Sequence, residues 1–68
     1  MEDSEWWLEY DAAAEWCARK GLRGEPGDPL PEMLSARCKR EIDEHPLAFQ
    51  TRVRDTAYAL AAARSERS

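Results

Sequence analysis

The sequence predicts an all-α fold, a small three-helix bundle with helices over about 5–20, 30–44 and 46–64. Eleven alanines against three glycines favour helix. The residues that favour strands by branching at Cβ are few: Ile42, Thr51, Val53 and Thr56. A chain of 68 residues forms one domain with a modest core, and we expect residues 1–3 and 65–68 to fray.

The first predicted helix has clear signals at both ends. Ser4 is a good N-cap, and Arg19 and Lys20 place positive charge at the carboxyl end. Gly21 then suits the left-handed residue that follows a helix, with Leu22 making the hydrophobic contact of a Schellman motif. At about 100° per residue, one face should form the core, with Trp7 at its edge. The residues on that face are Trp6, Tyr10, Ala13, Ala14 and Cys17.

The stretch GLRGEPGDPLP, residues 21–31, predicts a loop because it holds every glycine and most prolines. We expect Asp28 to cap the second helix, with Pro29 and Pro31 in its first turn, where no amide donor is needed. Its apolar stripe has a spacing of four, with Met33 beside it. The stripe is Leu30, Leu34, Cys38 and Ile42.

Pro46 should end the second helix, because the residue before a proline avoids the α region. Pro46 should also open the third helix. The predicted core face of this last helix is Phe49, Val53, Ala57 and Leu60.

A second apolar strip lies on the opposite side of the first helix. Leu8, Ala12 and Trp16 are spaced by four, and the flanking acids are Glu5, Glu9 and Glu15. An apolar strip with a charged rim is typical of a surface that binds a partner. The other interpretation is that Trp16 is partly buried under Leu22 and the proline-rich loop.

Charge is unevenly distributed along the chain. Residues 1–15 carry six acids and no base, a net −6, whereas residues 16–68 carry eight acids and ten bases, a net +2. The whole chain is therefore at −4. We expect a protein partner with a basic surface, reached by electrostatic steering that weakens with salt.

Signatures of catalysis are missing from the sequence. It has one histidine and no GxSxG or glycine-rich phosphate loop. Cys17, Cys38 and His45 lack the short spacings of zinc sites. We predict no enzyme, no catalytic residue, no metal and no cofactor. We also expect a cytoplasmic protein, since no membrane-spanning run or signal sequence is present. There, Cys17 and Cys38 should be free thiols, with a disulfide as the alternative.

The alternative function is DNA binding by a small transcriptional regulator. The basic residues for it are Arg37, Arg40, Arg52 and Arg54. Two helices joined tightly near Pro46 are broadly similar to a helix-turn-helix. Interleaved acids such as Glu41 and Asp55 instead favour solvated helix faces with i,i+4 pairs.

Three stretches, DAAAEW, PLPEML and EHPLAFQTRVRD, give a layout that resembles the theta subunit of bacterial DNA polymerase III. That resemblance implies a three-helix accessory protein. The loop with RGEPGD and the length of the second helix depart from the family pattern, and no theta residue role is carried over. In size and acidity the chain also resembles phage or plasmid accessory proteins, including anti-CRISPR inhibitors.

Together these patterns predict a non-enzymatic protein that binds another protein through its acidic, tryptophan-bearing first helix. It would act as an inhibitor or accessory subunit of a nucleic-acid-handling complex. A homodimer through the strip from Leu8 to Trp16 is the third interpretation.

Overall fold

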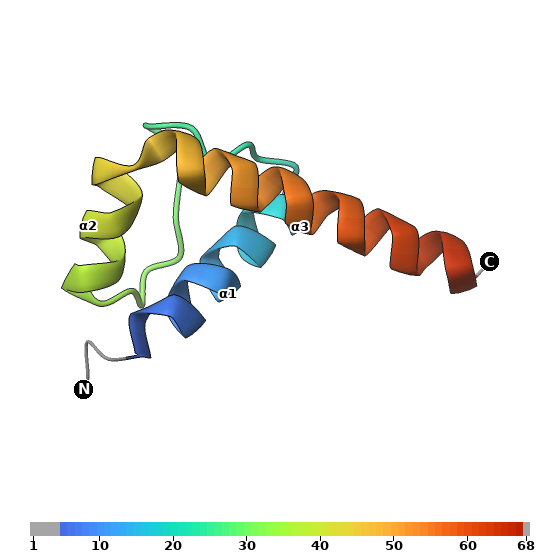
Figure 1. Ribbon diagram of the computed structural model, residues 1–68, viewed down its shortest axis with the longest axis horizontal. Helices are drawn as coiled ribbons and strands as arrows, with labels where there is room; N and C mark the ends of the chain where they lie inside the picture. Colours follow the sequence, from blue (N-terminus) through green and yellow to red (C-terminus); the bar gives the residue numbers. More distant parts are fainter. Residues whose placement is uncertain (1–4, 68) are drawn as a thin grey trace.

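Three helices make up the fold in the computed structural model, which describes residues 5–67 (Figure 1). They are α1 (Trp6–Arg19), α2 (Ala36–Glu44) and α3 (Pro46–Arg67). No strand occurs over residues 5–67, so the all-α three-helix bundle is confirmed. Ser4, the predicted N-cap of α1, lies outside the described residues.

The carboxyl end of α1 forms the predicted Schellman motif. Gly21 has a φ of 75°, in the left-handed region. The N–H of Leu22 donates to the carbonyl of Cys17 at 2.9 Å, and the N–H of Gly21 donates to that of Ala18 at 3.2 Å. These two bonds satisfy carbonyls that the helix leaves unpaired and turn the chain into the loop.

The predicted start of the second helix at residue 30 is wrong, because α2 begins at Ala36. Ser35 is its N-cap, and the Ser35 hydroxyl accepts a 3.2 Å hydrogen bond from the N–H of Cys38. Asp28 instead closes a turn, accepting from the N–H of Glu25 at 3.1 Å. The physical reason is that Pro29 and Pro31 keep the residues before them out of the α region.

The non-helical segment before α2 still contributes to the core. Leu30 and Leu34 are partly buried and pack against the core cluster from the loop. Met33, predicted to lie beside the stripe, is 89% exposed, and residues 30–34 do not form a helix. The apolar spacing therefore identified two core residues and assigned them to the wrong element.

The core lies where the three helices meet. Its fully or nearly buried residues are Ala13, Ala14, Cys17, Cys38, Ile42, Phe49 and Val53. Tyr10 of α1 packs edge-on against Phe49 of α3, with ring centroids 5.3 Å apart, and edge-on against Trp6 at 5.7 Å. Edge-to-face rings add to the stability that burial alone provides. The predicted core face of the first helix is thus confirmed.

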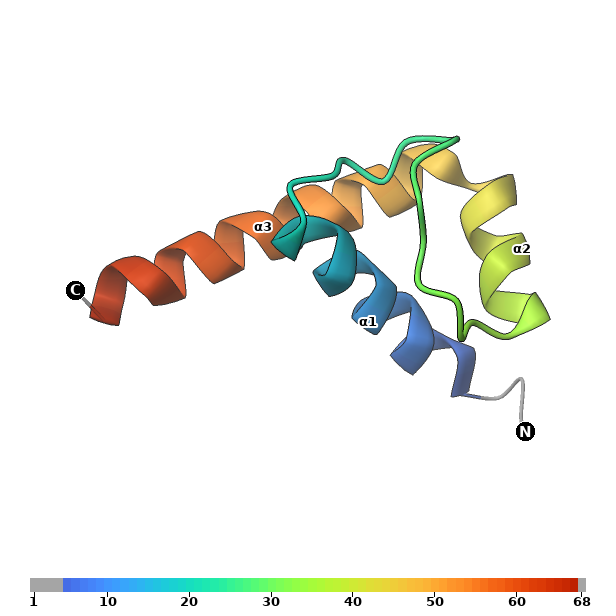
Figure 2. The ribbon, with the colours of Figure 1, turned by 180° about the vertical axis from the view of Figure 1, so that it is seen from behind.

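The long loop is fixed against α3 by Gly24. Figure 2 shows the loop crossing α3 before it descends to the start of α2. Gly24 is buried with a φ of +76°, and a Cβ built on it would lie 2.8 Å from Val53 Cγ2 and 3.0 Å from the Phe49 ring. Only a residue without a side chain allows this backbone to approach α3 so closely.

The carboxyl half of α3 extends beyond the other two helices (Figure 1). Ala57, predicted to be in the core, is exposed, because α1 has already ended where α3 reaches it; Leu60 is partly buried. We call residues 57–67 the arm. The radius of gyration is 12.3 Å, against about 11 Å expected for a compact chain of this length. No helix within residues 5–67 is long and apolar enough to cross a membrane.

Candidate functional site

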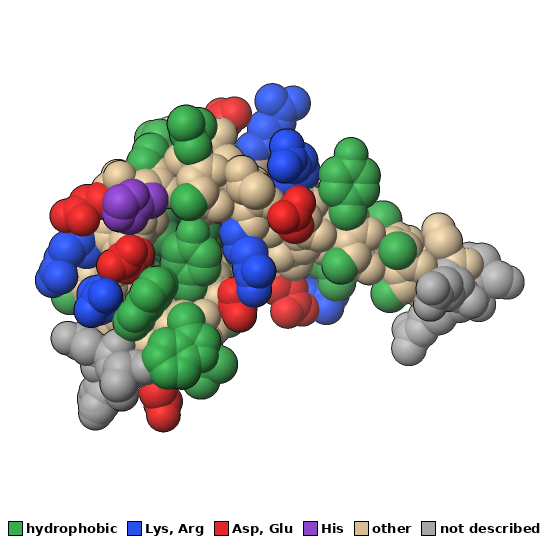
Figure 3. Space-filling model, viewed as in Figure 1, with side chains coloured by type: hydrophobic (Ala, Val, Ile, Leu, Met, Phe, Trp, Pro, Cys, Tyr) green, Lys and Arg blue, Asp and Glu red, His purple; other side chains and the backbone are tan. Residues whose placement is uncertain are grey.

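α1 exposes apolar side chains on the side that points away from the core and on one flank. Leu8 is 55% exposed, Trp7 is 50% exposed and Ala12 is exposed. Leu8 and Ala12 are one helical turn apart and belong to the predicted strip. Figure 3 shows hydrophobic side chains gathered over the amino-terminal part of α1, with an acidic side chain at their edge. Contiguous exposed apolar side chains of this kind are typical of an interaction site.

The other end of the predicted strip is partly covered. Trp16 is partly buried and packs against the core cluster, as does Leu22 from the loop. The ammonium nitrogen of Lys20 lies 4.9 Å from the centroid of the Trp16 ring, a cation–π contact. Trp16 therefore lies at the boundary between the core and the surface.

Trp7 is the surface residue that the sequence placed at the core edge. Trp7 lies about 80° around the helix from the centre of the core face, a position that is compatible with either a buried or an exposed side chain. The sequence signal for its exposure is Asp11, an acid one helical turn along on the same side of the helix. In the structure Asp11 is exposed and its carboxylate pairs with Arg52 of α3 at 2.5 Å. We call Glu5, Leu8, Ala12 and Glu15, together with Trp7 on the flank about 100° around the helix from Leu8, the α1 outer face.

The three predicted rim acids have different surroundings. Glu5 is exposed. Glu15 forms an i,i+4 ion pair with Arg19 at 2.7 Å. Glu9 accepts a 2.7 Å hydrogen bond from the backbone N–H of Ser35, and this bond lowers the pKa of the Glu9 carboxyl. Glu9 thus holds α2 against α1, leaving Glu5 and Glu15 as the rim of the α1 outer face.

The arginines of the alternative DNA site form internal contacts. Arg37 pairs with Glu41 at 2.9 Å and lies over the Trp6 ring at 5.2 Å. Arg52 pairs with Asp11, as above, and Arg54 is 3.8 Å from Asp55. Arg40 is exposed on α2. On the face drawn in Figure 3, basic side chains lie in separate groups over α2 and α3, with acidic side chains between them.

The two cysteines are buried thiols. Cys17 and Cys38 are free and fully buried, so the thiol interpretation is confirmed and the disulfide is not formed. Burial raises the pKa of both thiols, that of Cys38 to about 11. A thiol is a poor nucleophile until it loses its proton, so neither side chain is activated. Among the side chains that the structure describes, no three of His, Cys, Asp or Glu gather as a metal site would require.

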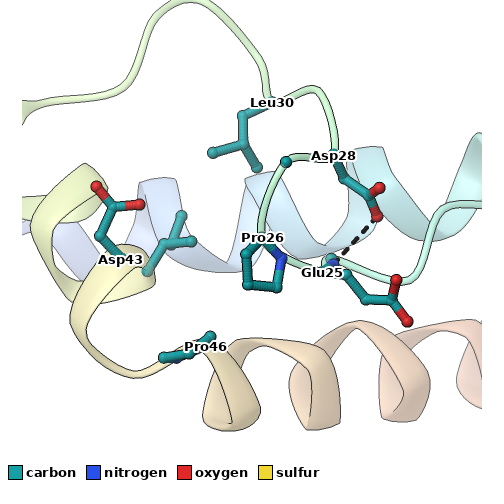
Figure 4. Close-up of a pocket in the computed structure, with 9 residues that line it drawn as sticks. Glu25, Pro26, Asp28, Leu30, Asp43 and Pro46 are labelled. Atoms are coloured by element: carbon teal, nitrogen blue, oxygen red, sulfur yellow. Dashed lines mark hydrogen bonds between the residues drawn. The ribbon is translucent and has the colours of Figure 1, made fainter.

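A small hollow lies between the loop and the α2–α3 junction (Figure 4). Its volume is about 60 Å³, far below the roughly 300 Å³ at which small-molecule sites begin. Figure 4 shows Pro26 and Leu30 from the loop facing Pro46 and Asp43, with the Asp28–Glu25 hydrogen bond beside them. The hollow has room for a water molecule or two.

A larger open groove of about 660 Å³ follows α3. It is lined by Leu22, Arg23, Glu25, Leu47, Gln50, Thr51, Val53, Arg54 and Ala57. Arg23 and Glu25 are 3.9 Å apart and partly neutralise each other. The lining offers apolar contact and two arginines.

Comparison with protein-family models, with curated proteins and with solved structures finds no match. The resemblance to the theta subunit therefore gains no support from these comparisons.

Proposed function

We propose that this protein acts by binding another protein through the α1 outer face, without catalysing a reaction. The observation that carries the proposal is the exposure of Trp7 and Leu8, neighbours on one helix and each about half accessible to solvent. Tryptophan is among the residues that most often dominate binding energy at protein interfaces. A partner that covers this tryptophan and this leucine removes their apolar surface from water, which favours binding.

Charge supports a basic partner. The segment of residues 1–15 carries a net −6, and Glu5 and Glu15 flank the apolar centre of the α1 outer face. Opposite charge on the partner speeds association and orients it before the apolar contact forms. Proteins that handle nucleic acids have such basic surfaces. We therefore propose an inhibitor or accessory subunit of a nucleic-acid-handling complex, acting in the cytoplasm.

The test is capture of partners from a lysate of the source organism on the tagged protein, with nuclease added. We expect a protein to be retained by the wild type and eluted by rising salt. Trp7→Ala and Leu8→Ala should each lose it, because each removes part of the apolar centre. Met33→Ala is the matched control, since Met33 is more exposed but isolated on the loop. Equal loss with all three variants would contradict the proposal.

Direct binding of DNA is the competing outcome, and a titration with duplex DNA at low salt tests it. Arg40→Glu reverses the charge of a predicted DNA contact that is exposed on α2. A salt-dependent shift of the wild type that Arg40→Glu abolishes, with no protein retained from the lysate, would replace the proposed function.

A further inference from the structure

The core-facing stripe of α3 continues past the end of the core. Phe49 and Val53 are buried, and Thr56 and Leu60 are partly buried. With Ala63 these positions follow one another by four, three, four and three residues. That alternation is the seam of one helix that packs against another along its length.

The described part of the chain covers only the first half of this seam. Leu22 and Arg23, where the chain leaves α1, lie along the same groove as Val53 and Ala57. On a neighbouring stripe of α3, outside the seam, a second hollow is lined by residues of α3 itself: Arg54, Ala57, Tyr58 and Ala61. Figure 3 shows hydrophobic side chains along the arm. Helices in proteins owe most of their stability to a packed face. We therefore expect another helix to pack against the seam residues of the arm.

The α1 outer face repeats the same spacing. Glu5, Leu8, Ala12 and Glu15 follow one another by three, four and three residues. Laid antiparallel to the arm, this face puts Leu8 opposite Ala63 and Ala12 opposite Leu60. A large side chain then meets a small one at both central levels, as a well-packed helix pair requires.

Charge decides which surfaces meet. Residues 1–15 are at −6, whereas the arm, residues 57–67, carries two arginines and one acid, a net +1. Pairing α1 with α1, or α3 with α3, would bring like charges together. Pairing α1 of one molecule with the arm of another brings opposite charges together.

We infer that two copies of this chain form a twofold dimer in which the arm of each lies antiparallel on the α1 outer face of the other. The inference rests on the proposed function, because it uses the same face and names a second copy as an occupant. Each copy supplies both surfaces, so two identical contacts close the assembly without a free end. A foreign partner and the second copy then compete for the α1 outer face.

Sedimentation equilibrium over a concentration series tests this. We expect the mass to rise from the 7.8 kDa monomer toward twice that value, and to fall back as salt goes from about 0.05 M to about 0.5 M. Leu60→Glu and Ala63→Glu should each weaken association by roughly a hundredfold, since each change falls in both contacts. Tyr58→Glu, at an exposed position outside the seam, is the control and should associate as the wild type does.

A paired variant tests the register. Ala12→Glu and Leu60→Lys should each weaken the dimer, and together they should recover at least tenfold of the loss by placing opposite charges at one level. A wild type that stays monomeric, or the lack of any recovery, overturns the inference. A monomer that still captures a protein through Trp7 and Leu8 would overturn the dimer and leave the proposed function intact. A dimer that captures no protein would support the dimer and contradict the proposed function. Circular dichroism of each variant confirms that its helices are intact.

Discussion

The carboxylate of Glu9 in α1 accepts a 2.7 Å hydrogen bond from the backbone N–H of Ser35, the N-cap of α2. The donor is one of the amide groups at a helix start that the helix itself cannot satisfy, and the charge lies near the positive end of the α2 dipole. This bond joins two helices across the whole proline-rich loop. Glu9 was predicted from the sequence to be a rim acid of a binding surface, and this bond shows that it has a structural role.

The stability of the fold should depend on the charge of Glu9. The pKa of this carboxyl is lowered in the folded state, so its stabilisation is present above the ordinary glutamate pKa of about 4.3. It is lost as the pH falls through the folded value. We expect Glu9→Gln to lower the melting temperature at pH 7 and to approach the wild type near pH 3. Thermal melts across that range measure the gap, with Glu15→Gln as the control; a gap that does not change with pH would refute the prediction.

Ser35→Ala should reduce the free energy of unfolding by about 1 kcal/mol, because it removes the hydroxyl that caps α2. Ser35→Asn keeps a capping oxygen and should cost much less. Urea unfolding of both variants distinguishes the effect of the cap from that of the side chain's size. Equal losses would mean that α2 does not depend on this cap.

Gly24→Ala should be the most damaging glycine substitution in the loop. The added methyl would meet Val53 Cγ2 at 2.8 Å, in addition to the strain of a positive φ. At Gly27, with φ +96°, nothing lies within 4 Å of the added methyl, so Gly27→Ala carries the backbone cost alone. We expect losses of about 3 kcal/mol and about 1 kcal/mol. Chemical denaturation of the two variants measures the difference, and equal losses would place Gly24 away from α3.

Native protein at pH 8 should react slowly with a thiol reagent such as dithiobis(nitrobenzoate). Cys17 and Cys38 are fully buried, and burial raises both thiol pKa values, so access and thiolate content are both low. After unfolding in urea, both thiols should react at once, giving two equivalents of reacted thiol per chain. Met33→Cys, at an exposed position, is the control and should add one rapid equivalent. Rapid reaction of both native cysteines would contradict the buried core.

Features set by neighbouring residues could be predicted from the sequence. The Schellman end of α1 depends on Gly21 and Leu22, and the stop before α3 depends on Pro46. The start of α2 could not be predicted in this way, because Leu30 and Leu34 have helical spacing yet reach the core from a loop. The restriction that Pro31 places on the residue before it outweighed the periodicity.

The candidate site was predicted in part for a different reason. Leu8 and Ala12 lie opposite the core face, so helical geometry alone places them at the surface. Trp7 and Trp16 lie on the flanks, where burial depends on how closely the neighbouring elements approach. Trp16 packs against the core cluster and Trp7 is half exposed, and no local pattern states how far the neighbouring elements cover either flank.

Gly24 also determines where this chain can accept an inserted peptide. Because the backbone of Gly24 lies against Phe49 and Val53, the first part of the loop covers the core in addition to the three helices. The exposed turn at Gly27 touches nothing that an added side chain would disturb. A guest peptide inserted at Gly27 should leave the native fold intact, whereas one inserted at Gly24 should disrupt it.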